Sequence, residues 1–447
     1  MRLKRLKVTA TLIIVAIATT ISLAGFTSRS YAATPTQLSS DELIHPLLTY
    51  LGKYSPQVRF QCQSPLAVNR CFGPQDFYKA YNINPLLSQG ITGKGRTIAI
   101  IDLNQAPTIR HDLHVFDQYF GLPDPILNIF TPEQTDMPTD TYTAAETSLD
   151  VEVAHAIAPD ATINLVLVPF RTFADIPNIQ KATTFVVNNN LGDVLSQSYG
   201  LGESADPTFV QALHQSFIQA TKKNITLLAA SGDTGAAVIT GIKGNQVAYG
   251  KGVEYPASDP LVTSVGGTNL YVNAEGKYSG ERAWNDSSSS SPLGTHNATG
   301  GGFSDVFPRP VYQNDIPGIG QYRGVPDVAY DAAGNTIIIC SSCGKGTDSA
   351  FLTGGTSAGS PQWAGIVALA DQVAGKRLGF LNPTLYGIGK NPAYATSFHD
   401  IQIGNNTYAY TNNGISGELP GYSTQLGWDA VTGWGSPDVA HLVSKLW

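Results

Sequence analysis

Continuous apolar runs alternate along the chain with stretches of helical periodicity. The apolar runs are rich in β-branched residues, which is typical of strands buried on both faces of a sheet. These runs cover residues 97–102, 163–168, 193–198 and 225–230. The helical stretches cover residues 144–158, 175–190 and 207–223. Strands that alternate with helices of this length predict an α/β fold, in which a parallel sheet carries helices on both faces.

The same pattern predicts how the chain is divided. One large α/β domain is expected over residues 76–447, preceded by a mixed, Pro-containing segment over residues 33–75 with a short helical stretch at 41–51. Residues 285–302 include five consecutive serines and predict a flexible surface loop. Reactive groups are expected at the carboxyl ends of the parallel strands, which meet at one edge of such a sheet.

The first 32 residues have the layout of a secretory signal peptide. A basic start, MRLKRLK, precedes a long uncharged apolar run, and Ser30 and Ala32 supply the small residues of a cleavage site after Ala32. An uncleaved membrane anchor is the alternative, because the apolar run is about long enough to span a bilayer. We expect cleavage, and therefore a secreted, extracellular protein without membrane contact once residues 1–32 are removed.

Composition and charge narrow the range of partners. Charged residues make up 14% of the 447 residues, and the formal net charge is −7. Removing residues 1–32 deletes five basic residues and no acidic ones, which brings the net charge to −12. A chain without a basic excess is not expected to bind nucleic acid. A surface that loses negative charge as the pH falls toward about 4 suits acidic surroundings.

Four cysteines form two closely spaced pairs, Cys62 with Cys71 and Cys340 with Cys343. In an exported protein these pairs are expected to form two small disulfide loops. The sequence Cys340-Ser-Ser-Cys343 also fits a redox motif or half of a zinc site, although no second pair of Cys or His at ligand spacing lies nearby.

Two carboxylates share one face of the predicted helix at residues 144–158. Glu146 and Asp150 are four positions apart, a spacing that places Cβ atoms roughly 5–6 Å from each other. Two such acids repel when both are ionised, which raises one pKa and favours a shared proton at acidic pH. A solvated helix face is the alternative interpretation of this spacing.

Two glycine-bordered turns carry further candidate groups. Asp233 lies in the turn Ser-Gly-Asp-Thr-Gly directly after a predicted strand, where it is either a functional acid or an ordinary turn residue. Ser357 follows Gly-Gly-Thr and begins a long apolar helix. Free backbone N–H groups at such a position stabilise developing negative charge. The alternative is a helix cap, formed by Ser357 or by Ser360.

In combination these segments resemble a known family. The turn around Ser357 resembles the nucleophile turn of the subtilisin-like fold, but none of the eight histidines stands in the setting that subtilisins need. The helix with Glu146 and Asp150 and the turn with Asp233 are instead similar to those of the sedolisins, the serine-carboxyl peptidases in which glutamate replaces histidine. The resemblance runs from about Phe72 to the C-terminus. It includes Ala80-Tyr-Asn-Ile, Thr97-Ile-Ala-Ile-Ile-Asp102, Tyr255-Pro-Ala-Ser, Ser264-Val-Gly-Gly-Thr, Gly300-Gly-Gly-Phe-Ser304 and Pro326-Asp-Val-Ala.

The resemblance implies a role for each candidate group. Ser357 would be the nucleophile, Glu146 its general base, and Asp150 the group that orients Glu146. Asp233, protonated, would donate a hydrogen bond to the oxyanion together with the backbone N–H of Ser357. Because an aspartic acid donates only when protonated, such a site is expected to work best at acidic pH. Asp102, where subtilisins keep their own aspartate, is expected to be structural.

Two further sites are implied by the resemblance. The backbone of Ser198, Tyr199 and Gly200 would pair with an extended substrate as an added strand, while the Tyr199 ring contacts substrate or packs in the core. A calcium loop would bind one structural Ca²⁺ through carboxylates and backbone carbonyls. Its residues are Asp400, Ile401, Gln425, Gly427 and Asp429, with Gln425 where the family usually has glycine. Two ordinary loop acids are the alternative.

The function implied is that of a secreted serine-carboxyl peptidase, expected to be a monomer, which hydrolyses polypeptides at acidic pH as an endopeptidase or a tripeptidyl-peptidase. A catalytically silent secreted binding protein on the same fold is the alternative. Sedolisins normally carry a long pro-domain, and residues 33–75 are expected to be a short N-terminal segment instead of a full-length one.

Overall fold

The computed structural model describes residues 47–55, 59–133, 137–243, 246–287, 297–412 and 415–447. These residues all belong to one compact unit, Ala33–Trp447. The predicted signal peptide at residues 1–32 lies outside the described residues.

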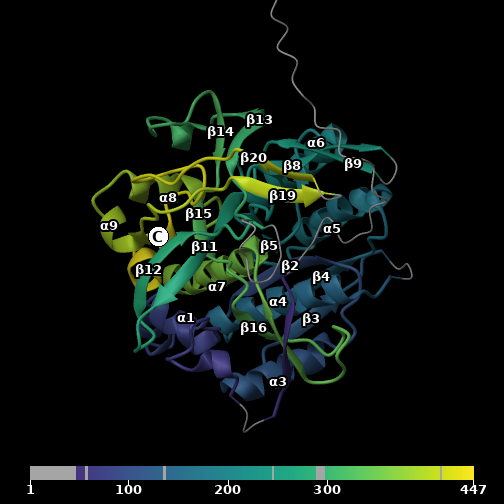
Figure 1. The fold of residues 1–447 in the computed structure, drawn as a ribbon, viewed down its shortest axis with the longest axis vertical. Coiled ribbons are helices and arrows are strands. Elements are labelled where there is room, and N and C mark those ends of the chain that lie inside the picture. The colour runs from purple at the N-terminus through teal and green to yellow at the C-terminus, as the bar shows by residue number, and fades with distance from the viewer. Residues whose placement is uncertain (1–46, 56–58, 134–136, 244–245, 288–296, 413–414) are drawn as a thin grey trace, which may run out of the picture. The chain divides into compact units, whose positions relative to one another are not determined.

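A parallel sheet forms the centre of this unit (Figure 1). The four predicted strands are neighbours in it, and the full order is β12-β11-β7-β5-β2-β4-β3, with β15 beside β11. Each of these neighbouring pairs is parallel except β11 with β12. The strands are β2 (Thr97–Leu103), β3 (Leu127–Phe130), β4 (Thr162–Val168), β5 (Val194–Gln197), β7 (Thr226–Ala230), β11 (Thr263–Val272), β12 (Tyr278–Ala283) and β15 (Val328–Asp331).

Helices cover both faces of the sheet, with α4 and α7 on one face and α5 and α6 on the other. Successive side chains of β2 show this division, because Ile98 and Ile100 join an apolar cluster with α7, whereas Ala99 and Ile101 join a cluster with α5 and α6. The helices are α4 (Thr141–Ile157), α5 (Ile176–Asn188), α6 (Pro207–Lys222) and α7 (Thr356–Ala374). The predicted α/β fold with a parallel sheet is confirmed.

Smaller elements surround this core. The other helices are α1 (Pro74–Ala80), α2 (Asn84–Leu87), α3 (Ile109–Phe120), α8 (Asn382–Gly389), α9 (Tyr394–Ser397) and α10 (Val439–Val443). Short strand pairs are β6 (Leu201–Gly202) with β10 (Glu254–Tyr255), β8 (Ala237–Lys243) with β9 (Gln246–Lys251), β13 (Gly302–Pro308) with β14 (Tyr322–Val325), β18 (Phe398–His399) with β21 (Ser436–Pro437), and β19 (Tyr408–Asn412) with β20 (Ile415–Leu419).

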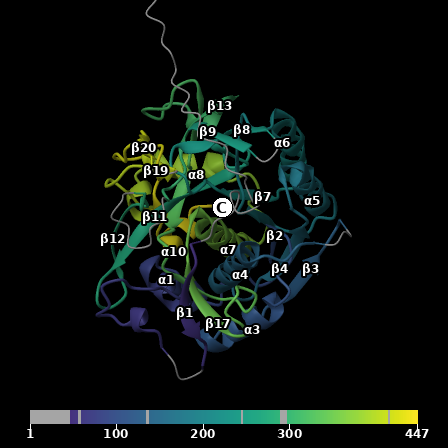
Figure 2. The same cartoon turned by 45° about the vertical axis from the view of Figure 1, so that its right-hand side comes forward.

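A glycine lets α7 approach α4 closely, and the two helices lie side by side in both views (Figures 1 and 2). A Cβ atom on Gly365 would lie 2.6 Å from Cβ of Ile157 and 3.2 Å from the carbonyl oxygen of Ala154. Real Cβ atoms do not approach other atoms so closely, so any larger residue at position 365 would push the two helices apart.

The N-terminal segment differs from its prediction. The helix expected at residues 41–51 is absent from its described part, because Thr49–Lys53 is strand β1. β1 pairs antiparallel with β17 (Ser349–Thr353), which pairs in turn with β16 (Thr336–Ile339). Local periodicity predicted a helix here, whereas hydrogen bonding to a strand some 300 positions later in the chain decides the conformation.

The surface loop predicted for residues 285–302 is wrong at its C-terminal end, and its middle stays a prediction. Residues 288–296 lie outside the described residues. On either side of them the chain is anchored, since Asn285 forms an isolated β-bridge with Ala298 and Ala298 is buried. Residues 299–301 are buried as well, so this end of the predicted surface loop is part of the core.

Both cysteine pairs form disulfides, as predicted: Cys62 with Cys71 and Cys340 with Cys343. The second pair lies in the turn between β16 and β17, where its sulfur atoms join a buried apolar cluster with α4. A redox or zinc role for Cys340-Ser-Ser-Cys343 is therefore not supported.

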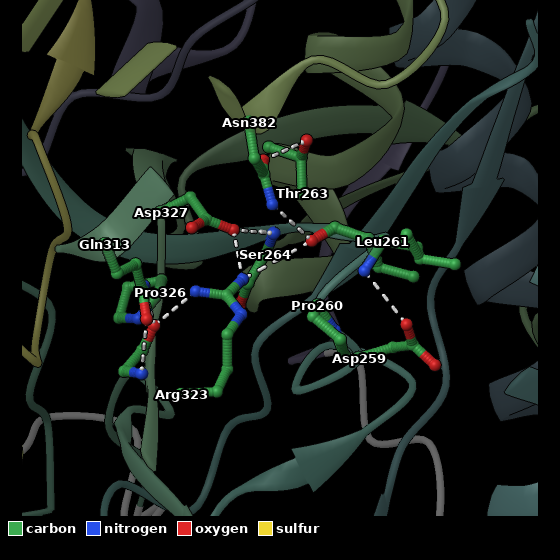
Figure 3. Close-up of polar contacts among 12 residues, drawn as sticks. Asp259, Pro260, Leu261, Thr263, Ser264, Gln313, Arg323, Pro326, Asp327 and Asn382 are labelled. Atoms are coloured by element: carbon green, nitrogen blue, oxygen red, sulfur yellow. Dashed lines mark hydrogen bonds and ion pairs between the residues drawn. The ribbon is translucent and has the colours of Figure 1, made fainter. Parts of the chain in front are cut away.

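A fully buried ion pair links β14 to the start of β11 (Figure 3). Arg323 Nη2 lies 2.5 Å from Oδ2 of Asp327, which also accepts a hydrogen bond from the backbone N–H of Ser264 at 2.8 Å. The other oxygen of Asp327 accepts from the Tyr386 hydroxyl at 2.9 Å. Both charges are thus paired and hydrogen-bonded, which is the condition under which ions tolerate burial.

Breaking this pair is expected to destabilise the fold strongly. Arg323→Met keeps much of the aliphatic stem but leaves the Asp327 carboxylate buried without its cation, a change that costs about 3–5 kcal/mol in the free energy of unfolding. Urea denaturation measures it. The matched control is Lys181→Met, which breaks the more exposed pair of Lys181 with Glu133 at 3.6 Å and is expected to cost about 1 kcal/mol or less. Equal losses in the two variants would contradict the prediction.

Candidate active site

Helix α4 carries the two carboxylates predicted from their spacing. Asp140 caps the helix by accepting hydrogen bonds from the backbone N–H groups of Tyr142 and Thr143, both at 3.0 Å. From Thr143 onward every residue of the helix is buried. Glu146 is 1% exposed and Asp150 0% exposed, which excludes the interpretation of a solvated helix face.

A third carboxyl group, that of Asp102 on β2, joins these two. Burial raises the pKa of Asp150 well above its usual range, and the charges of Asp102 and Glu146 raise it further. Burial raises the pKa of Glu146 in the same way, with Asp102 and Asp233 adding to the effect. The pKa of Asp102 itself rises to about 7, chiefly through burial. We call Asp102, Glu146 and Asp150 the carboxyl cluster; the structural role expected for Asp102 stays a prediction.

Ser357 lies at the start of α7 and faces the carboxyl cluster. Its hydroxyl is close enough to Glu146 to lower the pKa of that carboxyl, although the two groups do not have the geometry of a formed hydrogen bond. Ser357 is partly exposed, whereas Glu146 beneath it is buried. Neither serine caps the helix: the cap residue is Gly355, and Ser360 instead bonds Ser196, with 2.9 Å between their hydroxyl oxygens.

Asp233 is held against the same turn by Thr356. Its Oδ1 accepts hydrogen bonds from the backbone N–H of Thr356 at 2.8 Å and from the Thr356 hydroxyl at 2.7 Å. Its Oδ2 faces Gly355, where a Cβ atom would lie only 2.4 Å away, and φ of Gly355 is +107°. Glycine is therefore needed at position 355 on both counts. Burial raises the pKa of Asp233 to about 6, so Oδ2 can carry a proton in acid.

The segment after β5 lies beside this site. The Ser198 hydroxyl is near enough to Asp150 to lower its pKa. Tyr199 is 6% exposed, belongs to the apolar cluster under α5 and α6, and donates from its hydroxyl to Oε1 of Gln197 at 2.9 Å. Its ring therefore packs in the core. Substrate pairing with the backbone of residues 198–200 stays a prediction.

Glu254 is an acidic group at this site that sequence reasoning missed. A Cβ atom on Gly200 would lie 1.9 Å from Glu254 Oε2, and one on Gly232 would lie 2.6 Å from its Oε1. The carboxyl thus lies between the two backbone segments that end β5 and β7. Burial and the charge of Asp233 raise its pKa to about 8. A lone acid before Tyr255-Pro256 carries no local signal that would have identified it.

The predicted calcium residues lie together near the C-terminus. Asp400 Oδ1 accepts a hydrogen bond from the N–H of Gly427 at 3.1 Å, and Asp429 Oδ2 accepts from the N–H of Gln425 at 3.0 Å. Ile401, next to Asp400, is 1% exposed. The loop 425–429 therefore spans both carboxylates.

Carboxylate oxygens are ligands of the type that a hard cation prefers, although those of Asp400 and Asp429 all accept hydrogen bonds from protein donors in this structure. Burial raises the pKa of Asp429 to about 6, and no ion pair among the described residues includes Asp400 or Asp429. Gln425 does not have a positive φ, so its backbone does not require the usual glycine. In the described part of the chain no three His, Cys, Asp or Glu side chains converge on a metal, so a cation here would depend on carbonyl oxygens as well, which suits Ca²⁺.

Comparisons with known proteins find relatives over most of the chain. Kumamolisin of Bacillus sp. (strain MN-32) is 34% identical over 406 residues, which are 87% of this chain and 66% of that protein. A solved structure of Pseudomonas sedolisin, a serine-carboxyl proteinase in complex with pseudo-iodotyrostatin, superposes with a TM-score of 0.69 at 28% identity over 84% of this chain and 97% of the other. The chain belongs to the sedolisin family. The predicted subtilisin-like fold class is confirmed with it.

The other sedolisin-family relatives match over shorter lengths. Sedolisin of Pseudomonas sp. (strain 101) is 34% identical over 59% of this chain and 42% of that protein. Tripeptidyl-peptidase 1 of Mus musculus is 30% identical over 67% of this chain and 51% of that protein. The chain thus spans two thirds or less of the length of these curated relatives. No family model matches it, and none of the helices described here is long and apolar enough to cross a membrane.

The buried acids of this site predict a fold that loses stability as the pH rises. A carboxyl group whose pKa is higher in the folded state than in the unfolded chain holds its proton better when folded, so the unfolding free energy falls between the two pKa values. For Asp102 this window runs from about 4, the ordinary value, to about 7. Thermal unfolding followed from pH 4 to pH 8 is expected to show a falling midpoint.

Asp102→Asn isolates the contribution of that group, since an amide does not titrate. The variant is expected to lose less stability than the unmodified protein between pH 4 and pH 7. Glu275→Gln, on an exposed turn, is the matched control and should keep the slope of the unmodified protein. A midpoint that rises with pH in the unmodified protein would show that these acids are not protonated in the folded state.

Proposed function

We propose that this chain is a serine-carboxyl peptidase that cleaves polypeptides at acidic pH. The observation that carries the proposal is the pairing of a partly exposed serine hydroxyl, Ser357, with a buried carboxyl cluster instead of a histidine. Membership of the sedolisin family supports the same chemistry. A solvent-accessible nucleophile above a buried proton acceptor is the arrangement that acyl transfer needs.

The proposed reaction assigns one step to each group. Ser357 Oγ attacks the scissile carbonyl while Glu146 accepts its proton, and Glu146 then passes that proton to the leaving amine. Water attacks the acyl-enzyme in the second half with Glu146 again as base, which releases the acid product and restores the Ser357 hydroxyl. Asp150 holds Glu146 in place, with Asp102 as a third member of the cluster.

Asp233 supplies the electrostatic part of the proposal. Because its Oδ1 is engaged by Thr356, a proton on Oδ2 is directed toward the turn that carries Ser357. That O–H and the backbone N–H of Ser357 would both donate to the oxyanion. The proton is present only below a pH of about 6, where the pKa of Asp233 lies, so the oxyanion site should weaken as the pH rises through that value.

The proposal also covers secretion, a calcium ion, the substrate-binding backbone and the oligomeric state, each supported by a different observation. Two disulfides and the predicted signal peptide support secretion to the extracellular space. The chemistry of Asp400, Ile401, Gln425, Gly427 and Asp429 supports one structural Ca²⁺ ion. Ser198, Tyr199 and Gly200 are proposed to bind the substrate backbone. We also propose that the protein acts as a monomer.

The pH dependence of proteolysis tests the mechanism. With an unstructured protein as substrate, activity is expected to be highest in acid and to fall as the pH rises through about 6, since Asp233 then loses its proton. Ser357→Ala should have no activity at any pH, while Ser360→Ala in the same helix should keep it. Turnover by Ser357→Ala, or an optimum at neutral pH, would refute the proposed chemistry.

A matched pair of substitutions on α4 tests the general base in the same assay. Glu146→Gln is expected to lower kcat by roughly 10²–10⁴, the usual contribution of a general base. Glu152→Gln makes the same change on the same helix, but Glu152 accepts from the N–H of Ile339 at 2.9 Å and takes no part in the proposed reaction. It should therefore keep kcat, and equal losses in both variants would assign the effect of Glu146→Gln to folding.

Removal of calcium tests the proposed cation site. Chelation with EGTA is expected to lower the unfolding temperature, because a cation that binds only the folded state stabilises it and its removal takes that stabilisation away. Added Ca²⁺ should restore it and added Mg²⁺ should not. In the variant Asp429→Asn the response to EGTA should shrink. An unmodified protein whose unfolding temperature is the same with and without EGTA has no calcium site here.

A further inference from the structure

Residues 47–55 and 59–72 form a segment that we call the N-terminal strap. We propose that the strap is a permanent part of the catalytic domain that positions the nucleophile Ser357, and that it is not removed on activation. The proposal rests on the proposed function, because it concerns the geometry of that site.

The strap is hydrogen-bonded to the strand that leads into the nucleophile turn. β1 pairs with β17 from Lys53 opposite Ser349 to Thr49 opposite Leu352, and the backbone N–H of Tyr54 extends the contact by donating to Asp348 at 2.7 Å. In Figure 2 the two strands lie side by side. Leu352 is only five positions before Ser357, so this pairing fixes the strand end from which the nucleophile turn starts.

The first described residues of the strap pack beside the catalytic helices. Leu48 packs against an apolar cluster that includes Ala145 and Leu149, which flank Glu146 on α4, and Ala358, which follows Ser357 on α7. Leu47 is 7% exposed and packs with Trp284 and Ala332. The backbone oxygen of Ala332 accepts from the N–H of Gly355 at 2.9 Å. The strap therefore joins an apolar cluster to which both helices that carry the proposed nucleophile and base contribute.

The other end of the strap is anchored independently. Phe72 donates its N–H to the oxygen of Asn335 at 2.8 Å and accepts from the N–H of Ile337 at 3.0 Å. Phe60 is buried in a cluster with Phe116 and Ile339, and the Cys62–Cys71 disulfide closes the loop between Phe60 and Phe72. The strap is thus anchored at both ends, by β1 and by the buried residues Phe60, Cys71 and Phe72, whereas residues 61–70 are exposed or half-buried. Anchors at both ends oppose separation of the strap from the domain.

Loss of the strap would have a direct effect on the nucleophile. Without β1, strand β17 becomes an edge strand with unpaired backbone groups, and the apolar cluster to which α4 and α7 contribute loses its contact with Leu48. The position of Ser357 relative to Glu146 would then depend on fewer contacts. Misplacement of reacting groups by about 1 Å can cost 10²-fold in rate.

A reversible disulfide across the strand pair distinguishes a permanent strap from a removable one. Tyr50 and Phe351 are opposite each other in the register, and their ring centroids lie 5.4 Å apart. The two side chains therefore lie close together, which makes this pair the choice for an added disulfide. In the double variant Tyr50→Cys with Phe351→Cys, activity is expected to be the same with the added disulfide oxidised and after mild reduction. The single variant Tyr50→Cys controls for the loss of the ring and for the reductant. Intact mass of the active protein should include residues 47–72.

The possible outcomes are separable. Activity that appears only after the added disulfide is reduced, or an active protein whose mass lacks the strap, would overturn the proposal while leaving the peptidase intact. An unmodified protein without activity in the same assay would instead refute the proposed function, and the positioning role with it.

A positioning role also predicts a kinetic effect beyond stability. Leu48→Ala is expected to lower kcat by about tenfold or more with KM nearly unchanged, at a temperature at which the variant is fully folded. Leu51→Ala makes the same change on the same strand, but Leu51 packs with the cluster around Phe60 and Phe116. It should lower the unfolding temperature and keep kcat. If Leu48→Ala and Leu51→Ala have the same kcat, the strap stabilises the fold without positioning Ser357.

Discussion

Asp102, Glu146 and Asp150 are buried against one another, and no Lys, Arg or His in the described part of the chain forms an ion pair with any of them. An ionised carboxylate in such surroundings costs several kcal/mol, so the cluster retains protons that free carboxyl groups would release. In the proposed mechanism, this raised proton affinity would allow a carboxylate to act as the base in place of a histidine. The acidic limit of the proposed activity has a different source, because the pKa of Asp233 is only about 6 and its proton is lost above that pH.

The scaffold creates this burial through the approach of two helices. α4 is buried along almost its whole length, which is unusual for a helix with several acids. α7 lies close against it because Gly365 presents no side chain to Ile157, and α7 also brings Ser357 to the end of the sheet where Asp233 emerges from β7. β1 pairs with β17, the strand that leads into the turn with Ser357. The site is thus a property of packing between distant segments, and not of any one motif.

The sequence predicted correctly those features that depend only on residues close together in the chain. The β-branched runs predicted β2, β4, β5 and β7, because a strand that is buried on both faces is a short, continuous apolar run in the sequence. The spacing of Glu146 and Asp150 placed both on one helix face for the same reason. Three features were not predicted: the strand at Thr49–Lys53, the position of Asp102 beside the two acids of α4, and the position of Glu254 at the same site. Each depends on which distant segment packs against it. Hydrogen bonds from β17 override the helical periodicity around residue 50, and nothing near residue 254 in the sequence indicates Gly200 or Gly232 as neighbours.

Burial of acids extends beyond the carboxyl cluster. Glu281 is 8% exposed and accepts hydrogen bonds from Tyr81 and Thr268, each at 2.6 Å, and burial raises its pKa. Burial also raises the pKa of Asp331 to about 7. Like Asp102, these two acids lower the free energy of unfolding as the pH rises.

His214 also makes the fold less stable as the pH rises, but through a hydrogen bond and not through burial. A hydrogen bond with Asp259, 2.7 Å away, raises the pKa of its imidazole. The stability from that pair is present below the ordinary pKa of histidine and is lost as the pH rises through the raised value. Burial of acids is therefore common to the pH dependence of the fold and of the proposed activity, whereas His214 adds to the first through its hydrogen bond. Replacing Glu281 or Asp331 by an amide can widen the pH range of the folded state. The same change within the carboxyl cluster cannot widen the range of activity, because there the buried acid is itself the proposed base.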